Sequence, residues 1–399
     1  MNSRTFRYLS GRFRDYYRRT SLELPPEIDG REWGYIPWTE DGRTFMIRHK
    51  SIQQIGDPQT FLANEHPRHL YTTASKYEDP SAPSMEEKRW ESADLIFDID
   101  IDEQHLPDYI DEQDGLSHNE ELALAKKHLL RLLDVLDTDF GFEDIEIVFS
   151  GGRGYHVHVR DDSIQTLDSK QRSELVAYIQ GVNIDLDSLV KETGSTVNSR
   201  VTGADSKAFK PGGGWTTRVH KRLVEELDWA LDIVDEFHED EAVDRLVARD
   251  FHGIGKKKAQ AIITGFLEHE MEIRAGVVSV SPAIKSLTKA LVDEVHTDTY
   301  ADIDEPVSTD INRLIRLPGS LHGRTGFVVT RISRDDIDSF DPFADAVADV
   351  FTGREIEVEV TEETEVTALG TEYEFECGTT SVPEAVGIYL MAQGVAELA

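Results

Sequence analysis

Residues 94–101 read Asp-Leu-Ile-Phe-Asp-Ile-Asp-Ile, and this segment constrains the fold more than any other. From Phe97 onward apolar and acidic residues alternate strictly, which predicts a strand with one apolar and one acidic face. Leucine and alanine then recur every three or four residues over 120–136, which predicts a helix. A strand over 145–149, a glycine-rich turn over 150–154 and a strand over 155–160 follow. This succession predicts a mixed α/β unit built on a central sheet.

The acidic face of the first strand carries Asp98 and Asp100. Residues two apart on a strand share a face and lie about 6.6 Å apart along it. Two carboxylates so placed can bind Mg²⁺ or Mn²⁺, as a two-metal phosphoryl-transfer site requires. The alternative is an edge strand whose acidic face is simply solvated.

Two further segments carry groups that suit an anionic ligand. The turn Ser-Gly-Gly-Arg-Gly-Tyr-His supplies a hydroxyl, a guanidinium and an imidazole from Ser150, Arg153 and His156. Further along, Arg316 and His322 flank Pro318 and Gly319, a pattern typical of a second anion clamp. A glycine-rich hairpin with a chance arginine, and a structural role for either later residue, are the alternatives.

Charge and cysteine content limit the class of protein. Asp and Glu outnumber Lys and Arg by 77 to 42, a net charge of −35, and the acid is spread along the whole chain. Diffuse acidity with few lysines predicts a protein adapted to multimolar salt, where screening weakens self-repulsion; the alternative is a low-salt acidic protein that binds cations or basic partners. Cys377 is the one cysteine, which excludes disulfides and any cysteine-based zinc or iron–sulfur site. No apolar run approaches the ~20 residues of a membrane span, so a cytoplasmic protein with no membrane contact is expected.

Two local basic segments stand out against this acidity. The first 20 residues carry arginine at positions 4, 7, 12, 14, 18 and 19 on an expected amphipathic helix. Together they could contact phosphates, although a solvated face is the simpler reading of any one of them. Residues 251–262, Phe-His-Gly-Ile-Gly-Lys-Lys-Lys-Ala-Gln-Ala-Ile, resemble a helix-hairpin-helix phosphate binder, and an ordinary helical turn is the alternative.

The order of these motifs resembles the catalytic small subunit of archaeal and eukaryotic-type DNA primase. That order is Asp-x-Asp, then Ser-Gly-x-Arg-Gly-x-His, then a third Asp followed by a basic residue and Ser-Leu-His. The context is similar too, with Tyr16-Tyr17, then Arg31-Glu32-Trp33, then Lys88-Arg-Trp-Glu-Ser-Ala before the first aspartate pair. The resemblance covers residues 1 to about 335. Gly152 stands where some members have a second arginine.

The resemblance implies the roles of the site residues. Asp98, Asp100 and Asp304 would bind the Mg²⁺ or Mn²⁺ ions, with Asp302 and Asp310 as competitors for the third position. Ser150, Arg153, His156, Arg316 and His322 would hold the incoming nucleotide. Family members usually carry a Cys/His zinc knob, but segment 104–119 has His105 and His118 and no cysteine, so we expect no zinc.

The resemblance also implies an activity and partners. The chain would be a nucleotidyltransferase that makes short primers from nucleoside triphosphates on single-stranded DNA, as a heterodimer with a large primase subunit. Its catalytic core would comprise 1–165 and 296–340, with a helical insertion at 166–295 and a C-terminal α/β extension at 341–399. The alternatives are a repair or end-joining polymerase of the same superfamily, and a non-catalytic nucleic-acid-binding module.

Some further elements are expected from local patterns. Trp33, Tyr35 and Trp38 are expected on one strand, and residues 166–200 and 222–295 are expected to be mainly helical. The pattern is strand-like again from Asp302, through 314–316 and 327–332. Ser381 is expected to cap a final helix.

Overall fold

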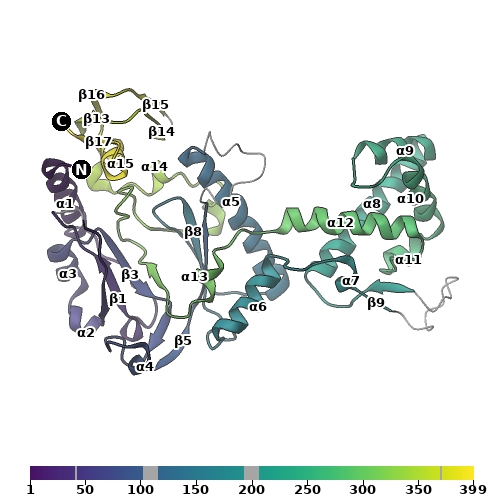
Figure 1. The fold of residues 1–399 in the computed structure, drawn as a ribbon, viewed down its shortest axis with the longest axis horizontal. Helices are drawn as coiled ribbons and strands as arrows, with labels where there is room; N and C mark the ends of the chain where they lie inside the picture. Colours follow the sequence, from purple (N-terminus) through teal and green to yellow (C-terminus); the bar gives the residue numbers. More distant parts are fainter. Residues whose placement is uncertain (41–42, 102–115, 193–205, 369–370) are drawn as a thin grey trace. The chain divides into compact units, whose positions relative to one another are not determined.

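The computed structural model of the protein describes residues 1–40, 43–101, 116–192, 206–368 and 371–399. The chain forms two compact units. The first unit comprises Met1–Leu130, Phe142–Val176 and Asp302–Ala399, and the second comprises Arg131–Gly141 and Ala177–Ala301. Helices α5 (His118–Val135) and α6 (Ser169–Ile179) contribute residues to both units (Figure 1). The mixed α/β class predicted from the sequence is confirmed.

The first sheet of unit one contains the segments that the sequence predicted most clearly. Its strand order is β12-β7-β8-β6, and all neighbours are antiparallel. The apolar face of β6 buries Phe97 and Ile99 completely, as its period of two requires. The predicted strand, helix, strand and hairpin are therefore confirmed. Their bounds are β6 (Leu95–Asp100), α5, β7 (Ile145–Phe149), β8 (Gly154–Val159) and β12 (Thr330–Ile332).

The second sheet of unit one joins segments that are far apart in the sequence. Its order is β11 (Leu314–Arg316), β3 (His69–Thr73), β1 (Trp33–Ile36) and β2 (Ile47–Lys50), and a separate ribbon pairs β4 (Ser75–Tyr77) with β5 (Trp90–Ala93). The prediction that Trp38 lies on the strand of Trp33 and Tyr35 is wrong. The strand ends at Ile36, because Pro37 has no N–H to donate to a neighbouring strand.

Short helices complete the core of unit one. They are α2 (Ile52–Ile55), α3 (Pro58–Glu65), α4 (Met85–Lys88), α13 (Glu305–Thr309) and α14 (Pro342–Asp345). The strand-like pattern expected from Asp302 holds at β11 and β12 but not at α13. Pro306 lies in the first turn of α13, where a missing N–H costs nothing, so this stretch begins a helix.

The two ends of the chain lie side by side in unit one (Figure 1). The Asn2 backbone N–H donates to Glu397 Oε1 at 2.7 Å, and the Leu398 N–H donates to Thr5 Oγ1 at 2.8 Å. The predicted cap at Ser381 is wrong, because this residue pairs with Glu357 in a sheet and the helix begins at Glu384. The elements here are α1 (Ser3–Tyr17), β13 (Glu355–Val360), β14 (Thr364–Ala368), β15 (Thr371–Phe375), β16 (Gly378–Pro383), α15 (Glu384–Gln393) and β17 (Ala396–Leu398).

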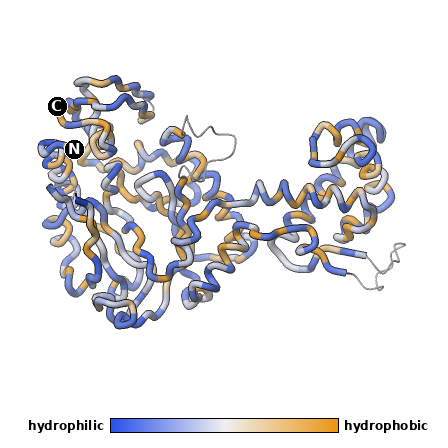
Figure 2. Tube along the Cα trace, viewed as in Figure 1, coloured by the Kyte–Doolittle hydropathy of each residue, from blue (hydrophilic) through white to orange (hydrophobic). Residues whose placement is uncertain are grey.

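Unit two is mainly helical, as predicted, with one exception. A two-stranded ribbon of β9 (Val190–Glu192) and β10 (Lys207–Phe209) interrupts the helices. Hydrophilic and hydrophobic residues alternate along α12 (Figure 2), which buries Ile284, Leu287 and Leu291 in an apolar core. No helix among the described residues is long and apolar enough to cross a membrane. The helices are α7 (Leu186–Leu189), α8 (Trp215–Phe237), α9 (Glu239–Ala248), α10 (Lys256–Glu268), α11 (Glu270–Arg274) and α12 (Pro282–Thr299).

Candidate active site

The two aspartates of β6 face His156 and Gly154 on the neighbouring strand β8. Asp98 pairs in register with His156, and its Oδ1 lies 3.6 Å from His156 Nε2. Asp100 pairs with Gly154, and its Oδ1 lies 3.9 Å from the Nε of Arg153. The carboxylates of Asp98 and Asp100 are 19% and 52% exposed, so the pair spans the boundary between core and solvent.

A third carboxylate reaches this pair through the backbone. The N–H of Asp304 donates a hydrogen bond to the carbonyl oxygen of Asp98 at 2.9 Å. Asp304 is also the N-cap residue of α13. Of the two competitors, Asp310 lines the same pocket, whereas the backbone N–H of Asp302 donates to His128 Nδ1 at 3.0 Å and Asp302 is not a lining residue.

These carboxylates line one pocket of about 480 Å³. Both acidic and basic side chains line it, from β2, β6, β11 and the segment between α13 and β11. The lining residues are Met46, Arg48, Tyr71, Asp98, Asp100, His156, Asp304, Asp310, Asn312, Arg313, Leu314, Ile315 and Arg316. A phosphate bound together with a metal ion would meet both arginines and carboxylates in one pocket.

Crowding of the carboxylates shifts their titration. Burial, the negative charge of Asp100 and, more weakly, that of Asp304 raise the pKa of Asp98 to about 7, against the opposing effect of Arg316 and Arg313. Burial and the same two arginines lower the pKa of His156 to about 3. The imidazole of His156 is therefore neutral near pH 7, and its approach to Asp98 is not an ion pair.

The oxygen ligands at this site match the preference of Mg²⁺ and Mn²⁺. Burial and the charges of Asp100 and Asp304 outweigh the two arginines in raising the pKa of Asp98, so a bound cation would favour the ionised carboxylate. Within the described residues, no three acidic, imidazole or thiolate groups already converge on one point as a preformed metal site would. The chemistry of the residues fits a divalent cation, and binding would have to draw the carboxylates together.

The turn between β7 and β8 requires glycine at two positions. A Cβ on Gly154 would lie 1.8 Å from the carbonyl oxygen of Ile99, so only glycine lets β8 approach β6 here. Gly151 has φ of +79°, and a Cβ there would lie 2.7 Å from His322 Cβ. The Gly152 N–H donates to Ser150 Oγ at 3.3 Å, which folds the turn back on itself.

His322 and Arg316 approach the site from the opposite end of the sequence. The side chain of His322 lies against Gly151, and its Nδ1 is 3.1 Å from Thr325 Oγ1. Burial, followed by Arg316, holds the pKa of His322 well below its usual value, so this imidazole is neutral as well. The guanidinium of Arg316 lies 5.9 Å from the ring centre of Tyr71, and its buried Nε has no hydrogen-bond partner in the described part of the chain.

The structure thus divides the predicted site residues into two adjoining groups. Asp98, Asp100, Asp304, His156 and Arg316 line the pocket. Ser150, Arg153 and His322 gather at the β7–β8 turn and do not line it. Arg153 connects the two groups, because its Nε lies 3.9 Å from Asp100 Oδ1.

Sequence reasoning missed Arg48, Tyr71 and Arg313. The sequence could have indicated Arg313, because it lies only three residues before Arg316, which was itself predicted to bind an anion. It could not have indicated Arg48 and Tyr71, since no motif marks them. Tyr71 enters the site because β3 pairs with β11, which puts it opposite Arg316.

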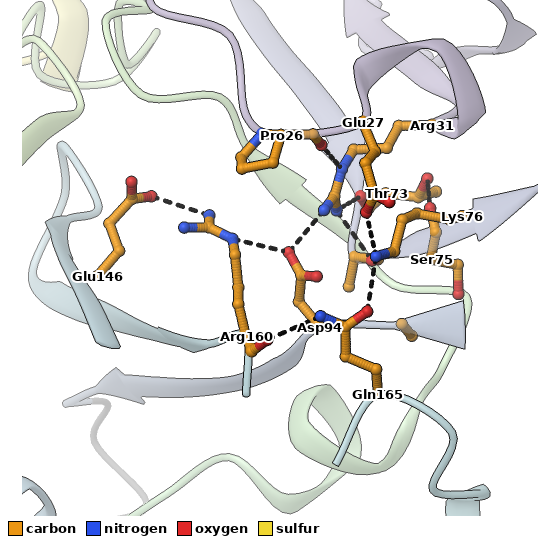
Figure 3. A network of polar contacts seen from close by, with 12 residues as sticks. Pro26, Glu27, Arg31, Thr73, Ser75, Lys76, Asp94, Glu146, Arg160 and Gln165 are labelled. Atoms are coloured by element: carbon orange, nitrogen blue, oxygen red, sulfur yellow. Dashed lines mark hydrogen bonds and ion pairs between the residues drawn. The ribbon is translucent and has the colours of Figure 1, made fainter. Parts of the chain in front are cut away.

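A network of buried charges fixes the start of β6, where Asp94 lies (Figure 3). Asp94 Oδ2 accepts from Arg31 at 2.8 Å and from Arg160 at 3.1 Å. Arg160 continues to Glu146 on β7 at 3.1 Å, and Arg172 donates to the carbonyl oxygens of Ala93 and Asp94. Arg31, which belongs to the sequence context of the resemblance, and Asp94 therefore anchor the strand that carries the catalytic candidates.

The two basic segments fold as helices. On α1, Arg12 is buried against Glu384, whereas arginines 4, 7 and 14 on the helix and arginines 18 and 19 just after it are exposed. In unit two, residues 251–255 connect α9 to α10. Lys256 pairs there with Asp244 at 2.7 Å, and Lys258 donates to the carbonyl oxygen of Gly253 at 2.9 Å.

Comparison with known proteins gives a consistent result. The family model described as DNA primase small subunit matches residues 97–334. The chain is 46% identical to the DNA primase small subunit PriS of Halorubrum lacusprofundi and 45% identical to that of Haloarcula marismortui, in each case over 100% of this chain and 99% of the relative. It is 36% identical to the protein of the same name from Methanococcoides burtonii, again over 100% of this chain and 99% of the relative.

Proposed function

The chain belongs to the family of DNA primase small subunits, and on that premise we propose that it is the catalytic subunit that starts DNA synthesis by making primers. The reaction would be template-directed nucleotidyl transfer from nucleoside triphosphates. One observation carries this proposal above the others. The backbone hydrogen bond between Asp304 and Asp98 joins a third carboxylate to a pocket that Arg313 and Arg316 also line.

Asp98, Asp100 and Asp304 are the proposed ligands of Mg²⁺ or Mn²⁺. Such ions would supply charge neutralisation for the attacking 3′ oxygen and the departing pyrophosphate. The three carboxylates contribute by holding negative charge in the pocket, and Asp98 must release its proton to do so. Asp310 lines the same pocket and is the remaining competitor of Asp304.

Arg316, Arg153, Ser150, His156 and His322 are the proposed contacts of the incoming nucleotide. Arg316 lines the pocket and its buried Nε has no hydrogen-bond partner among the described residues, so a phosphate oxygen could accept from it. The neutral imidazoles of His156 and His322 can each donate one N–H without adding a charge. Gly152 contributes no side chain to this cradle.

The alternatives are less well supported. A repair or end-joining polymerase would be expected to match relatives with another name. The relatives described above are named DNA primase small subunit, and each matches this chain over 99% of its own length. A non-catalytic module would be expected to lose carboxylates, and here three of them line one pocket.

Assembly and location complete the proposal. We infer a heterodimer with a large primase subunit, single-stranded DNA as template, and a cytoplasmic location because the template is there. We expect no zinc. The segment that would hold it lies largely outside the described residues, since 102–115 are not among them.

Primer synthesis on a poly-dT template with Mn²⁺ and adenine nucleotides tests this function. The wild-type chain, together with its large subunit, should make short primers, and Asp98→Asn should make none. Titration of Mn²⁺ followed by electron paramagnetic resonance gives a readout independent of turnover, and Asp98→Asn should bind Mn²⁺ more weakly. Primer synthesis by the variant at the wild-type rate would overturn the proposal.

A further inference from the structure

A second cavity in unit one is lined by arginine and aromatic side chains. It measures about 510 Å³. Arg68 and Arg324 lie on it beside Trp38 and Phe6, and no acidic residue of the described chain lines it. The lining residues are Met1, Phe6, Pro37, Trp38, Thr39, Arg43, Arg68, Arg324, Ala392, Gln393 and Gly394. We call it the arginine–tryptophan cavity.

Its positive charge is poorly compensated by the protein. The Arg324 side chain is exposed and makes no ion pair with any described residue. Burial and the nearby charge of Arg324 lower the pKa of Arg68. In a chain with 77 acidic and 42 basic residues, two guanidinium groups that face each other without a lining carboxylate indicate an anionic ligand.

The aromatic part of the cavity is held rigidly. The ring of Trp38 packs edge to face against Phe6 and Phe13, with centroids 5.8 and 5.0 Å apart. The guanidinium of Arg68 lies 5.5 Å from the Trp38 ring centre, and its Nε donates to the Gly323 carbonyl oxygen at 3.1 Å. Trp38 Nε1 is buried and has no hydrogen-bond partner among the described residues.

The cavity neighbours the candidate active site along β3. Tyr71 lines the catalytic pocket and Arg68 lines the arginine–tryptophan cavity. Arg68 directly precedes β3, and three residues of extended chain put its Cα about 10 Å from that of Tyr71, with the two side chains on opposite faces of the chain. His69 lies between them in the sequence, with its ring centre 4.9 Å from that of His322. Burial, followed by the charges of Arg316, Arg68 and Arg324, lowers the pKa of His69 to about 3, so arginines of both cavities lie near this one residue.

We propose that the arginine–tryptophan cavity binds the single-stranded DNA template, with a backbone phosphate on Arg68 and Arg324 and an unpaired base against Trp38 and Phe6. Guanidinium groups beside aromatic rings are the combination that single strands require, since bases of a duplex are already stacked and paired. This inference rests on the proposed function, because only a template-directed enzyme needs a single strand so close to its catalytic pocket.

A binding assay without metal ions or nucleotides tests the cavity separately from catalysis. The probe is fluorescein-labelled dT20, followed by anisotropy across a KCl series in which circular dichroism shows a folded protein. Arg324→Glu should raise Kd at least tenfold and reduce the slope of log K against log [KCl] by about 0.7 for each lost phosphate contact. Arg89→Glu, an equal charge change at an exposed residue outside the cavity and outside both basic segments, should raise Kd no more than twofold.

Other occupants would give different results. Asp98→Asn should bind dT20 as the wild type does, so a loss of primer synthesis there leaves this inference standing. Weaker ATP binding by Arg324→Glu with unchanged dT20 binding would assign the cavity to a free nucleotide and overturn the inference. Weaker capture of the large subunit with unchanged dT20 binding would assign it to a protein partner, with the same consequence. An equal loss for a 20-base-pair duplex would refute base stacking.

Cross-linking of the unaltered protein gives an independent readout. An oligo-dT carrying 5-bromodeoxyuridine, irradiated with the wild-type chain, should yield adducts in the peptides that contain Trp38 or Phe6. Adducts confined to peptides of the catalytic pocket would overturn the inference.

Discussion

The backbone N–H of Asp304 donates a hydrogen bond to the carbonyl oxygen of Asp98 at 2.9 Å. All of unit two, which comprises Arg131–Gly141 and Ala177–Ala301, lies between these two residues in the sequence. One backbone contact therefore brings the start of α13 to the middle of β6. The consequence is a pocket that is lined by carboxylates from two distant segments together with arginines.

Each of Asp98→Asn, Asp100→Asn and Asp304→Asn should abolish primer synthesis while leaving the fold intact. Loss of one carboxylate from a paired-metal site removes charge stabilisation in the transition state, and we expect at least about a 10²-fold lower rate. Stability should change little or rise, because the crowded carboxylates repel each other when no metal is bound. Primer-extension rates in saturating Mn²⁺ and thermal melting check both statements.

Neighbouring aspartates serve as controls for the third position. Asp302→Asn should retain activity, because Asp302 does not line the pocket. Asp310→Asn is the sharper comparison, since Asp310 does line it. An inactive Asp310→Asn beside a fully active Asp304→Asn would show that the third ligand is Asp310.

Metal affinity should increase as the pH rises through about 7. Asp98 has a folded-state pKa of about 7 against an ordinary value of 3.8, so the folded protein retains a proton between these values that the unfolded chain has lost. The free energy of unfolding of the metal-free protein should therefore fall from about pH 4 to pH 7, by at most about 4 kcal/mol. In Asp98→Asn this fall should be absent. Mn²⁺ titrations and urea unfolding between pH 4.5 and 8 measure both effects, and a pH-independent affinity would contradict the assignment.

Gly154→Ala should disrupt the sheet, and Gly152→Ala should not. A Cβ at Gly154 would collide with the Ile99 carbonyl oxygen at 1.8 Å, whereas one at Gly152 would lie 3.5 Å from its nearest neighbours in His322. We expect Gly154→Ala to lower the free energy of unfolding by more than about 3 kcal/mol, and Gly152→Ala by less than about 1 kcal/mol. Urea unfolding followed by circular dichroism distinguishes the two. Equal stability of the variants would mean that β8 and β6 do not approach as closely as described.

Asp94→Asn should be among the most destabilising single changes in this chain. It leaves the buried guanidinium groups of Arg31 and Arg160 without their shared carboxylate, at a cost of about 3–5 kcal/mol. The matched control is Glu78→Gln, which removes an exposed ion pair to Arg89 and should cost less than about 1 kcal/mol. If both variants unfold at the same urea concentration, the network does not anchor β6.

Withdrawal of salt should destabilise the protein. The net charge is −35, and several of the similar proteins come from halophilic archaea. Self-repulsion is screened within about 3 Å at 1 M salt but extends over about 10 Å at 0.1 M. Circular dichroism across a KCl titration should show loss of native signal toward 0.1 M. A full native signal with reversible melting there would favour the low-salt alternative.

Local pattern was sufficient for the elements that carry most of the candidate site. The alternation around Asp98 and Asp100 determines that both carboxylates share a face, since side chains on any strand repeat every second residue. The glycines at 151, 152 and 154 likewise indicate a tight turn before His156, because glycine adopts turn conformations that other residues rarely adopt. The order of these motifs was enough to identify the family resemblance.

Long-range pairing decided the rest. Whether Asp304 or a neighbour reaches Asp98, and whether Tyr71 lies opposite Arg316, depends on contacts between segments that no local period relates. The same holds for Ser381. Its local sequence suits a helix cap, but pairing with Glu357 on β13 places it in a strand. Side-chain periodicity determines which face a residue occupies, but only the tertiary structure determines what that face meets, because a backbone hydrogen bond can form with any strand that packing brings near.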